Sequence, residues 1–294
     1  MVKLKADFIS DWITYLRERL IQEGWRADEI QRLAERDVPI SFFESRRRRL
    51  ASRPRLLKIA ADFQCPTVDQ VGWTALQKKV TMGADLNPHL SERHSNIAHF
   101  DGLLAEWQVH HFHLGTDFDP KNPQYVTRTG SLVFALVDDN SFCAINVFPH
   151  RTHWEEIGIV ESIHRNWPDM ISKYRVKGVT PETLDKNQRR ALREHNGNVL
   201  VGTKDGTVYV PIGGGVVGSG AKMECVMSAD KWCIEIQDLQ VSFEKQLSEL
   251  MPTFEQCGYA GEDEIEGQLK ITETGYQVFF PKYSVLANLQ IRHL

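Results

Sequence analysis

The chain lacks the features that mark several large classes of protein. Its five cysteines are odd in number and widely spaced, and no two form a Cys-x-x-Cys pair, which argues against a disulfide framework or a zinc ribbon. No apolar run approaches the roughly 20 residues of a membrane-spanning helix, and the first residues lack the apolar stretch of a secretory signal. We therefore expect a cytoplasmic protein in a reducing compartment, with no membrane partner.

An excess of one charge is also missing. The formal net charge is −4 over 294 residues, so any contact with nucleic acid must come from a local basic patch. The sequence has no Gly-Lys-Ser/Thr phosphate-binding loop and no His-Glu-x-x-His zinc motif. Function must therefore be sought in local clusters of side chains.

Histidine is the residue that the chain concentrates. Nine of its 11 histidines lie between His89 and His164. Imidazole changes charge near neutral pH and is a common metal ligand, so the concentration suggests proton transfer, metal binding or phosphate contact. Five of the nine are expected to pack in the core or to cap and decorate helices: His89, His94, His99, His110 and His164. Four remain as candidates for catalysis: His111, His113, His150 and His153.

Apolar periodicity predicts an α+β fold in three regions. Residues 1–80 are expected to be helical, with helices over 6–20, 27–35, from Ser41 onward and over 56–63. Residues 81–178 should hold a helix over 92–108 and a central antiparallel sheet of a strand at 109–114 and a hairpin of 131–137 with 142–148. Residues 179–294 should form a supporting α+β layer, with helices over 181–195 and 228–250 and strands over 267–272 and 276–280.

A basic run lies in the third predicted helix. This helix is expected to begin at Ser41, where Ser41 and Glu44 fit a capping box. This helix and the one before it, joined by a turn that contains Pro39, fit a helix-turn-helix. The run consists of Arg46, Arg47, Arg48 and Arg49. Consecutive cations without an acid among them suit contact with phosphates. A solvated helix face, balanced by acidic segments elsewhere, is the alternative interpretation.

Two of the candidate histidines should share one face of a strand. Because side chains alternate along a strand, and Phe112 and Leu114 require the core, His111 and His113 are expected to point together to the opposite surface. They would then be placed beside the hairpin that follows.

The other two candidates follow the last strand of that hairpin. His150, Arg151 and His153 precede an expected helix, capped by Thr152 and Glu155. A helix N-terminus favours an anion and keeps a nearby histidine neutral. If the two strands are adjacent, the imidazoles and Arg151 converge in a way that suits attack on a phosphodiester, with one histidine as base, another as acid and the arginine stabilising charge.

The central segment resembles a known family. Phe112-His-Leu-Gly115, Tyr125-Val-Thr-Arg128-Thr-Gly130, the apolar strand, the Asp138-Asp-Asn140 turn and the strand ending in His150-Arg151 are similar to the sheet core of RelE/ParE-like bacterial toxins. The resemblance covers about residues 109–154. In that family an Arg-x-Gly step precedes a strand-turn-strand hairpin, and RNA-cleaving members act without metal on the 2′-hydroxyl and phosphate.

This resemblance implies a function and its residues. Arg128 would contact phosphate, and His150 with Arg151 would be the basic pair after the last strand. The chain would be a metal-independent endoribonuclease of toxin or phage-defence type, with RNA as its substrate and an antitoxin or regulatory protein as a partner. No cofactor would be required.

Two alternatives remain open on the same residues. His111 and His113 with Asp117 would give a divalent metal such as zinc or manganese three ligands and an open position for water, as in a metal-dependent nucleotide or phosphoester hydrolase. The second alternative is a non-enzymatic, nucleic-acid-binding regulatory protein that acts through Arg46–Arg49.

Overall fold

The computed structural model describes residues 2–150, 152, 157–180 and 184–289. Its helices and sheets confirm the α+β class. The chain divides into two compact units, residues 1–43 with 227–294 and residues 44–226. These units differ from the three regions expected from the sequence, because the first 43 residues group with the C-terminal segment.

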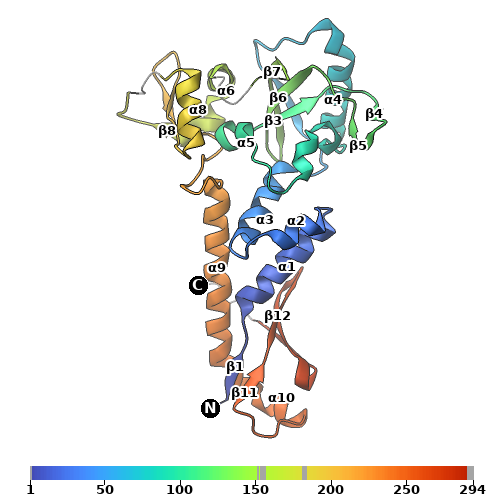
Figure 1. The fold of residues 1–294 in the computed structure, drawn as a ribbon, viewed down its shortest axis with the longest axis vertical. Coiled ribbons are helices and arrows are strands. Elements are labelled where there is room, and N and C mark those ends of the chain that lie inside the picture. The colour runs from blue at the N-terminus through green and yellow to red at the C-terminus, as the bar shows by residue number, and fades with distance from the viewer. Residues whose placement is uncertain (1, 151, 153–156, 181–183, 290–294) are drawn as a thin grey trace. The chain divides into compact units, whose positions relative to one another are not determined.

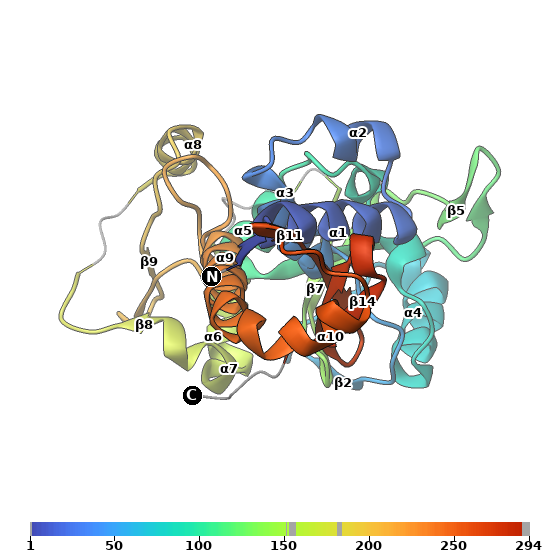
Figure 2. The same cartoon turned by 90° about the horizontal axis from the view of Figure 1, so that it is seen from below.

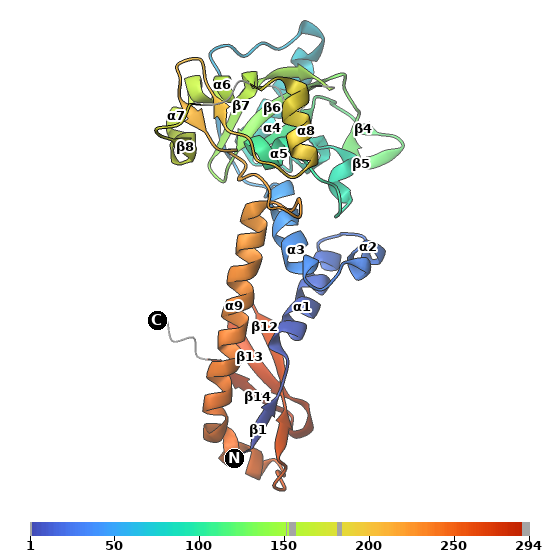
Figure 3. The same ribbon diagram turned by 60° about the vertical axis from the view of Figure 1, so that its left-hand side comes forward.

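The first unit consists of helices around a small antiparallel sheet. The N-terminus of α1 (Phe8–Gln22) is capped by the Asp7 side chain, which accepts from Ser10 N. Phe8 and Phe243, with rings 6.3 Å apart, belong to a core that α1 and α9 form with the sheet (Figure 3). The remaining elements of this unit are α2 (Ala27–Arg32), α9 (Met223–Gln246), α10 (Met251–Gln256), the parallel pair β1 (Lys3–Lys5) and β11 (Glu264–Glu266), and the sheet β12 (Gln268–Thr272), β13 (Gly275–Phe280) and β14 (Val285–Asn288).

The second unit is built on a four-stranded sheet (Figure 1). Its strands, in spatial order, are β2 (Leu56–Ile59), β7 (Ser141–Pro149), β6 (Ser131–Val137) and β3 (Val109–His113). The antiparallel pairs β3–β6 and β6–β7 confirm the central sheet expected from the sequence. The helix predicted over 56–63 is wrong. Leu56 N and Ala60 N donate to Asn140 O and Ala144 O, so this segment is a strand parallel to β7.

Both faces of this sheet are covered. Phe112 of β3 packs with Phe142 and with α4 (Gln70–Met82), which contributes Trp73, Leu76 and Val80 to that core. On the opposite face, Phe134 and Leu132 of β6 join a core with α5 (Gly102–Trp107) and α6 (Gly158–Asn166). His111 and His113 lie on this second face, paired in register with Phe134 and Leu132.

Smaller elements complete the second unit. They are α7 (Pro168–Ile171), α8 (Lys186–Glu194), the sheet β8 (Arg175–Val176), β10 (Val208–Tyr209) and β9 (Val201–Gly202), and the hairpin β4 (Phe118–Asp119) and β5 (Asn122–Val126). The β4–β5 hairpin lies to one side of the four-stranded sheet, and α8 lies to the other (Figure 2). Within the residues described, no helix is both long and apolar enough to cross a membrane.

The helix predicted over 92–108 is wrong in its first half. The segment forms a short 3-10 turn at Glu92–Ser95, and α5 begins only at Gly102, where the Asp101 side chain accepts from Leu104 N. The guanidinium of Arg48 donates to the carbonyl oxygens of Asn96 and Ile97, so these carbonyls are satisfied outside a helix. The helical spacing of the apolar residues is therefore not sufficient for a helix here, and two of the backbone carbonyls are bound by a buried cation from elsewhere in the chain.

Helix α3 (Asp37–Arg48) also differs from expectation at its start. It begins at Asp37, so Ser41 and Glu44 lie inside the helix rather than forming a capping box. Pro39 lies in the first turn, where a missing N–H costs no helical hydrogen bond. The Glu44 carboxylate takes no part in a helix cap. It accepts a hydrogen bond from Arg48 at 2.8 Å and lies 3.2 Å from Lys222 Nζ.

Close packing of α4 against the end of β3 leads to a stability prediction. A Cβ added at Gly72 would overlap the carbonyl of Leu114, a backbone atom that cannot rotate away. Gly72→Ala should therefore destabilise the protein by about 1–3 kcal/mol, as overpacking of a core does, and lower the temperature of thermal unfolding by several degrees. The matched control is Gly218→Ala, whose Cβ would have no heavy atom within 4 Å. Equal unfolding temperatures for the two variants would contradict this packing.

Candidate functional site

Most of the side chains singled out in the central segment line one cavity. The cavity has a volume of about 490 Å³. Its walls include His111 and His113 of β3, Arg128, which precedes β6, and His150, which follows β7. Residues on separate strands thus meet because β3, β6 and β7 are neighbours in the sheet. The cavity also receives Arg93 from η3 (Glu92–Ser95), and Phe100 and Asp101 from the segment between η3 and α5.

His113 is held as a neutral imidazole. Burial, and then the positive charge of Arg128, lower its pKa to about 3. Its Nδ1 accepts from Thr129 N at 3.1 Å, so the single proton of the neutral ring is on Nε2. In this neutral ring the lone pair of Nδ1 already accepts a hydrogen bond, so the group left to interact with a ligand is the donor Nε2–H. The expectation that His113 acts as an acid or base is therefore not favoured by its surroundings.

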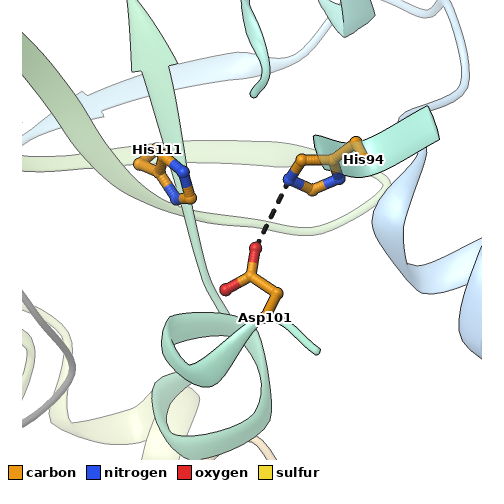
Figure 4. A group of neighbouring side chains, drawn as sticks. All are labelled: His94, Asp101 and His111. Atoms are coloured by element: carbon orange, nitrogen blue, oxygen red, sulfur yellow. Dashed lines mark ion pairs between the residues drawn. The ribbon is translucent and has the colours of Figure 1, made fainter. Parts of the chain in front are cut away.

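His111 belongs to a second group of polar side chains at the edge of the same cavity. His94, Asp101 and His111 each offer one ligand atom, and these atoms all lie within 4.8 Å of one another. Both imidazoles lie next to the Asp101 carboxylate, and His94 Nε2 is 3.3 Å from Asp101 Oδ2 (Figure 4). His94 and Asp101 are 6 % and 5 % exposed, which places this group largely out of contact with water.

The charges in this group are set by burial and by its members. Burial alone would raise the pKa of Asp101, but the hydrogen bond from His94 and the nearby His111 ring hold it well below its usual range. Burial lowers the pKa of the His111 imidazole, partly offset by the Asp101 carboxylate. The arrangement at neutral pH is therefore an ionised carboxylate beside a neutral His111.

Arg128 is fixed at the wall of the cavity. Its Nη1 donates to Leu90 O at 2.8 Å, its Nη2 lies 3.4 Å from Glu92 Oε1, and its guanidinium lies over the Tyr125 ring at 5.1 Å. These contacts use only part of a guanidinium with five N–H donors. The remaining donors and the positive charge face a cavity in which an anion would compete with the exposed Glu92.

His150 reaches this site from the end of β7. Its ring centroid is 5.4 Å from that of His113, and its backbone N–H donates to Gly130 O at 2.8 Å. His150 is exposed, unlike the strand histidines. Arg151 and His153, with the predicted cap residue Glu155, lie outside the described residues. The expected helix begins in the structure at Gly158.

The arginine run of α3 is not the open cationic face that the sequence suggested. Arg48 is 1 % exposed and bonds to Glu44 and to two carbonyls. Arg47 pairs with Glu224 and donates to Gly213 O. Arg46 is exposed and Arg49 half-buried, and both have interactions within the protein. The prediction that all four arginines contact nucleic acid is therefore wrong for Arg48, because its charge is buried and neutralised.

The remaining histidines differ in how they are held. His110 is buried on the other face of β3, with Nε2 3.2 Å from Arg47 O, and burial lowers its pKa to about 3. Burial also lowers the pKa of His89 to about 4, and its Nδ1 donates to His113 O. His164 contacts Tyr209 and Asp205. These contacts are structural, as expected for the three residues.

Reasoning from the sequence missed two members of the buried group. The sequence predicts that His94 decorates a helix, which does not form there, and it assigns no role to Asp101. One signal in the sequence points to Asp101. It directly precedes the apolar residues of α5, where an aspartate that caps a helix is expected. Asp117, by contrast, is exposed, bonds to Thr116 Oγ1 and does not line the cavity. Within the described part of the chain, the ligand group found is His94, Asp101 and His111.

Comparison of the chain with protein-family models, with curated proteins and with solved structures finds no match. The chemistry of the cavity is therefore the basis on which a function has to be inferred.

Proposed function

We propose that the protein is an enzyme that cleaves phosphodiester bonds of RNA in the cavity lined by His111, His113, Arg128 and His150. The observation that carries the proposal is the convergence of these four side chains from three segments on one cavity of about 490 Å³. That volume lies within the range of sites for small ligands, and it suits one nucleotide with its phosphates.

Arg128 is the group that binds the scissile phosphate. A guanidinium presents its donors in a planar fork that matches phosphate oxygens and keeps its charge at any physiological pH. The contacts with Leu90 O and Tyr125 hold the fork in place before substrate arrives. His113, neutral and with its proton on Nε2, adds an uncharged donor to the same wall.

Proton transfer divides between the two ends of the cavity. His111 and Asp101 form a basic end: the neutral His111 ring accepts the proton of the nucleophile, and the ionised Asp101 beside it stabilises the imidazolium that forms. His150, exposed at the other side of His113, is placed to protonate the leaving oxygen. Separate basic and acidic ends are what in-line cleavage of a phosphodiester requires.

RNA is favoured as the substrate by the similarity of residues 109–154 to RNA-cleaving toxins, and Phe100 adds a second argument. The Phe100 side chain is 40 % exposed at the cavity wall. Exposed aromatic rings stack on unpaired bases, which single-stranded RNA offers. A role in toxicity or phage defence, with an antitoxin or regulatory partner, follows from the same similarity.

The proposal is tested with purified full-length protein and an end-labelled single-stranded RNA, beside DNA of the same sequence. Wild type should cleave the RNA, and Arg128→Ala should lower kcat/KM by about 10- to 100-fold, because one charged contact to the phosphate is lost. Arg32→Ala, an exposed arginine of the other unit, is the matched control and should cleave as wild type does. Intact RNA after incubation with wild type, with and without added zinc or manganese, would refute the function.

A further inference from the structure

We propose that His94, Asp101 and His111 bind one divalent first-row transition metal ion, of which zinc and manganese are the representative cases. The three side chains come from η3, from the cap of α5 and from β3. Figure 4 shows the two imidazoles on either side of the Asp101 carboxylate. Imidazole nitrogens with a carboxylate oxygen are the donor set that such ions accept in proteins.

The spacing of the donor atoms fits an ion. Ligands roughly 2.0–2.1 Å from a tetrahedral zinc ion lie about 3.3 Å from one another. His94 Nε2 and Asp101 Oδ2 are already 3.3 Å apart, and the widest separation in the group is within 4.8 Å. The three donor atoms are therefore already gathered to nearly the spacing of the ligands of a bound ion.

The side chains of this group are not saturated by contacts within the protein. His94 and His111 each keep a buried Nδ1 without a hydrogen-bond partner among the described residues. Buried polar nitrogens without partners are rare and costly in a finished core. The two rings therefore still have capacity to interact with a bound ion, directly or through the water that completes its coordination.

The surroundings hold each ligand in place. Asp101 uses Oδ1 to cap α5, which leaves Oδ2 directed at His94. His111 is fixed by the β3–β6 ladder, opposite Phe134. The backbone after His94 is held by the contacts of Arg48 with Asn96 O and Ile97 O. Ligands fixed by such outer contacts bind a metal with less loss of conformational entropy.

The ion would have an open position towards the substrate. Asp101 and His111 line the cavity of Arg128 and His150, whereas His94 does not. Three protein ligands leave room for a water molecule, whose pKa such an ion lowers to near neutral. The metal-bound hydroxide would attack phosphorus, the bond to the leaving ribose oxygen would break, and that oxygen would take a proton from His150. This use of the ion rests on the proposed function, but its binding does not.

The test measures binding of Co²⁺ to chelator-treated, full-length protein by its visible absorption, with elemental analysis of the stoichiometry. We expect one Co²⁺ per chain, displaced by Zn²⁺, and an affinity at least about 100-fold lower in His94→Ala and in His111→Ala. Asp101→Asn keeps the α5 cap, since an amide oxygen also accepts there, and should lose binding while its circular dichroism stays that of wild type. His99→Ala, which removes another histidine of the same cavity, is the matched control and should bind as wild type does.

Binding of no Co²⁺, or equal binding by wild type, His111→Ala and Asp101→Asn, would overturn the metal site. The two proposals fail separately. RNA cleavage by a protein that binds no Co²⁺ would refute the metal site and leave the function, whereas undiminished cleavage by chelator-treated protein would refute the catalytic use of the ion. Stoichiometric Co²⁺ in a protein that leaves RNA intact would support the site and refute the function.

Discussion

Asp101→Asn is expected to lower RNA cleavage by about 100- to 1,000-fold, the largest loss of activity from any single change that keeps the fold. The substitution removes the negative charge at the basic end of the cavity and hardly changes the size of the side chain. It retains an oxygen that accepts from Leu104 N, so α5 still begins at Gly102. Cleavage is measured as kcat/KM on single-stranded RNA, beside thermal unfolding.

A comparison with Asp101→Ala separates chemistry from folding. The alanine variant loses the helix cap as well as the charge, and should be about 1 kcal/mol less stable than the asparagine variant. Both should be equally inactive. If Asp101→Asn cleaves RNA at the wild-type rate, Asp101 is only a helix cap, and the basic end of the cavity has been placed wrongly.

Arg193→Met is expected to cost about 3–5 kcal/mol of the free energy of unfolding. Arg193 of α8 pairs with Glu106 of α5, and the two are 8 % and 2 % exposed. Burial lowers the pKa of the Arg193 guanidinium to about 10, so it is still charged at neutral pH. Removing it leaves the Glu106 carboxylate buried without its counter-charge, and this unpaired buried charge lowers the free energy of unfolding.

Urea unfolding measures this effect, with Arg190→Met as control. Arg190 is an exposed neighbour in the same helix and should change stability by less than about 0.5 kcal/mol. The double variant Glu106→Met/Arg193→Met should recover most of the loss, because no unpaired charge remains. A single Arg193→Met variant as stable as the Arg190→Met control would show that the pair contributes nothing.

The parts of the site that the sequence predicted are those set by local pattern. Alternation along β3 predicts a shared face for His111 and His113, and the turn at Asp138–Ser141 predicts the hairpin that brings His150 beside them. Arg128 is instead assigned by the resemblance of residues 109–154 to the toxin family, in which an arginine precedes the first strand of that hairpin. Neighbouring strands then carry these residues to one cavity.

The parts that the sequence did not predict depend on contacts between distant residues. Leu56–Ile59 is a short apolar run, which periodicity alone cannot assign to strand or helix, and its pairing with β7 decides the outcome. His94 approaches Asp101 because the intervening segment is not helical, and Arg48, more than 40 positions earlier, is part of the reason. The burial of Arg48 depends on Glu44, one helical turn earlier, and on the Asn96–Ile97 segment. That segment is too far along the chain to fall in any local window around Arg48.

The contacts of Arg48 with Asn96 and Ile97 also bear on how much of the chain a fragment that contains the cavity would need. A fragment cut at residues 81–178 would contain every histidine of the cavity but neither Arg48 nor its partner Glu44. It would also lack Lys222, which is fully buried beside Glu44. A fragment that keeps these contacts has to extend from Glu44 to Lys222, which is nearly the whole second unit, residues 44–226. A shorter fragment would carry the reactive groups without the scaffold that aligns them.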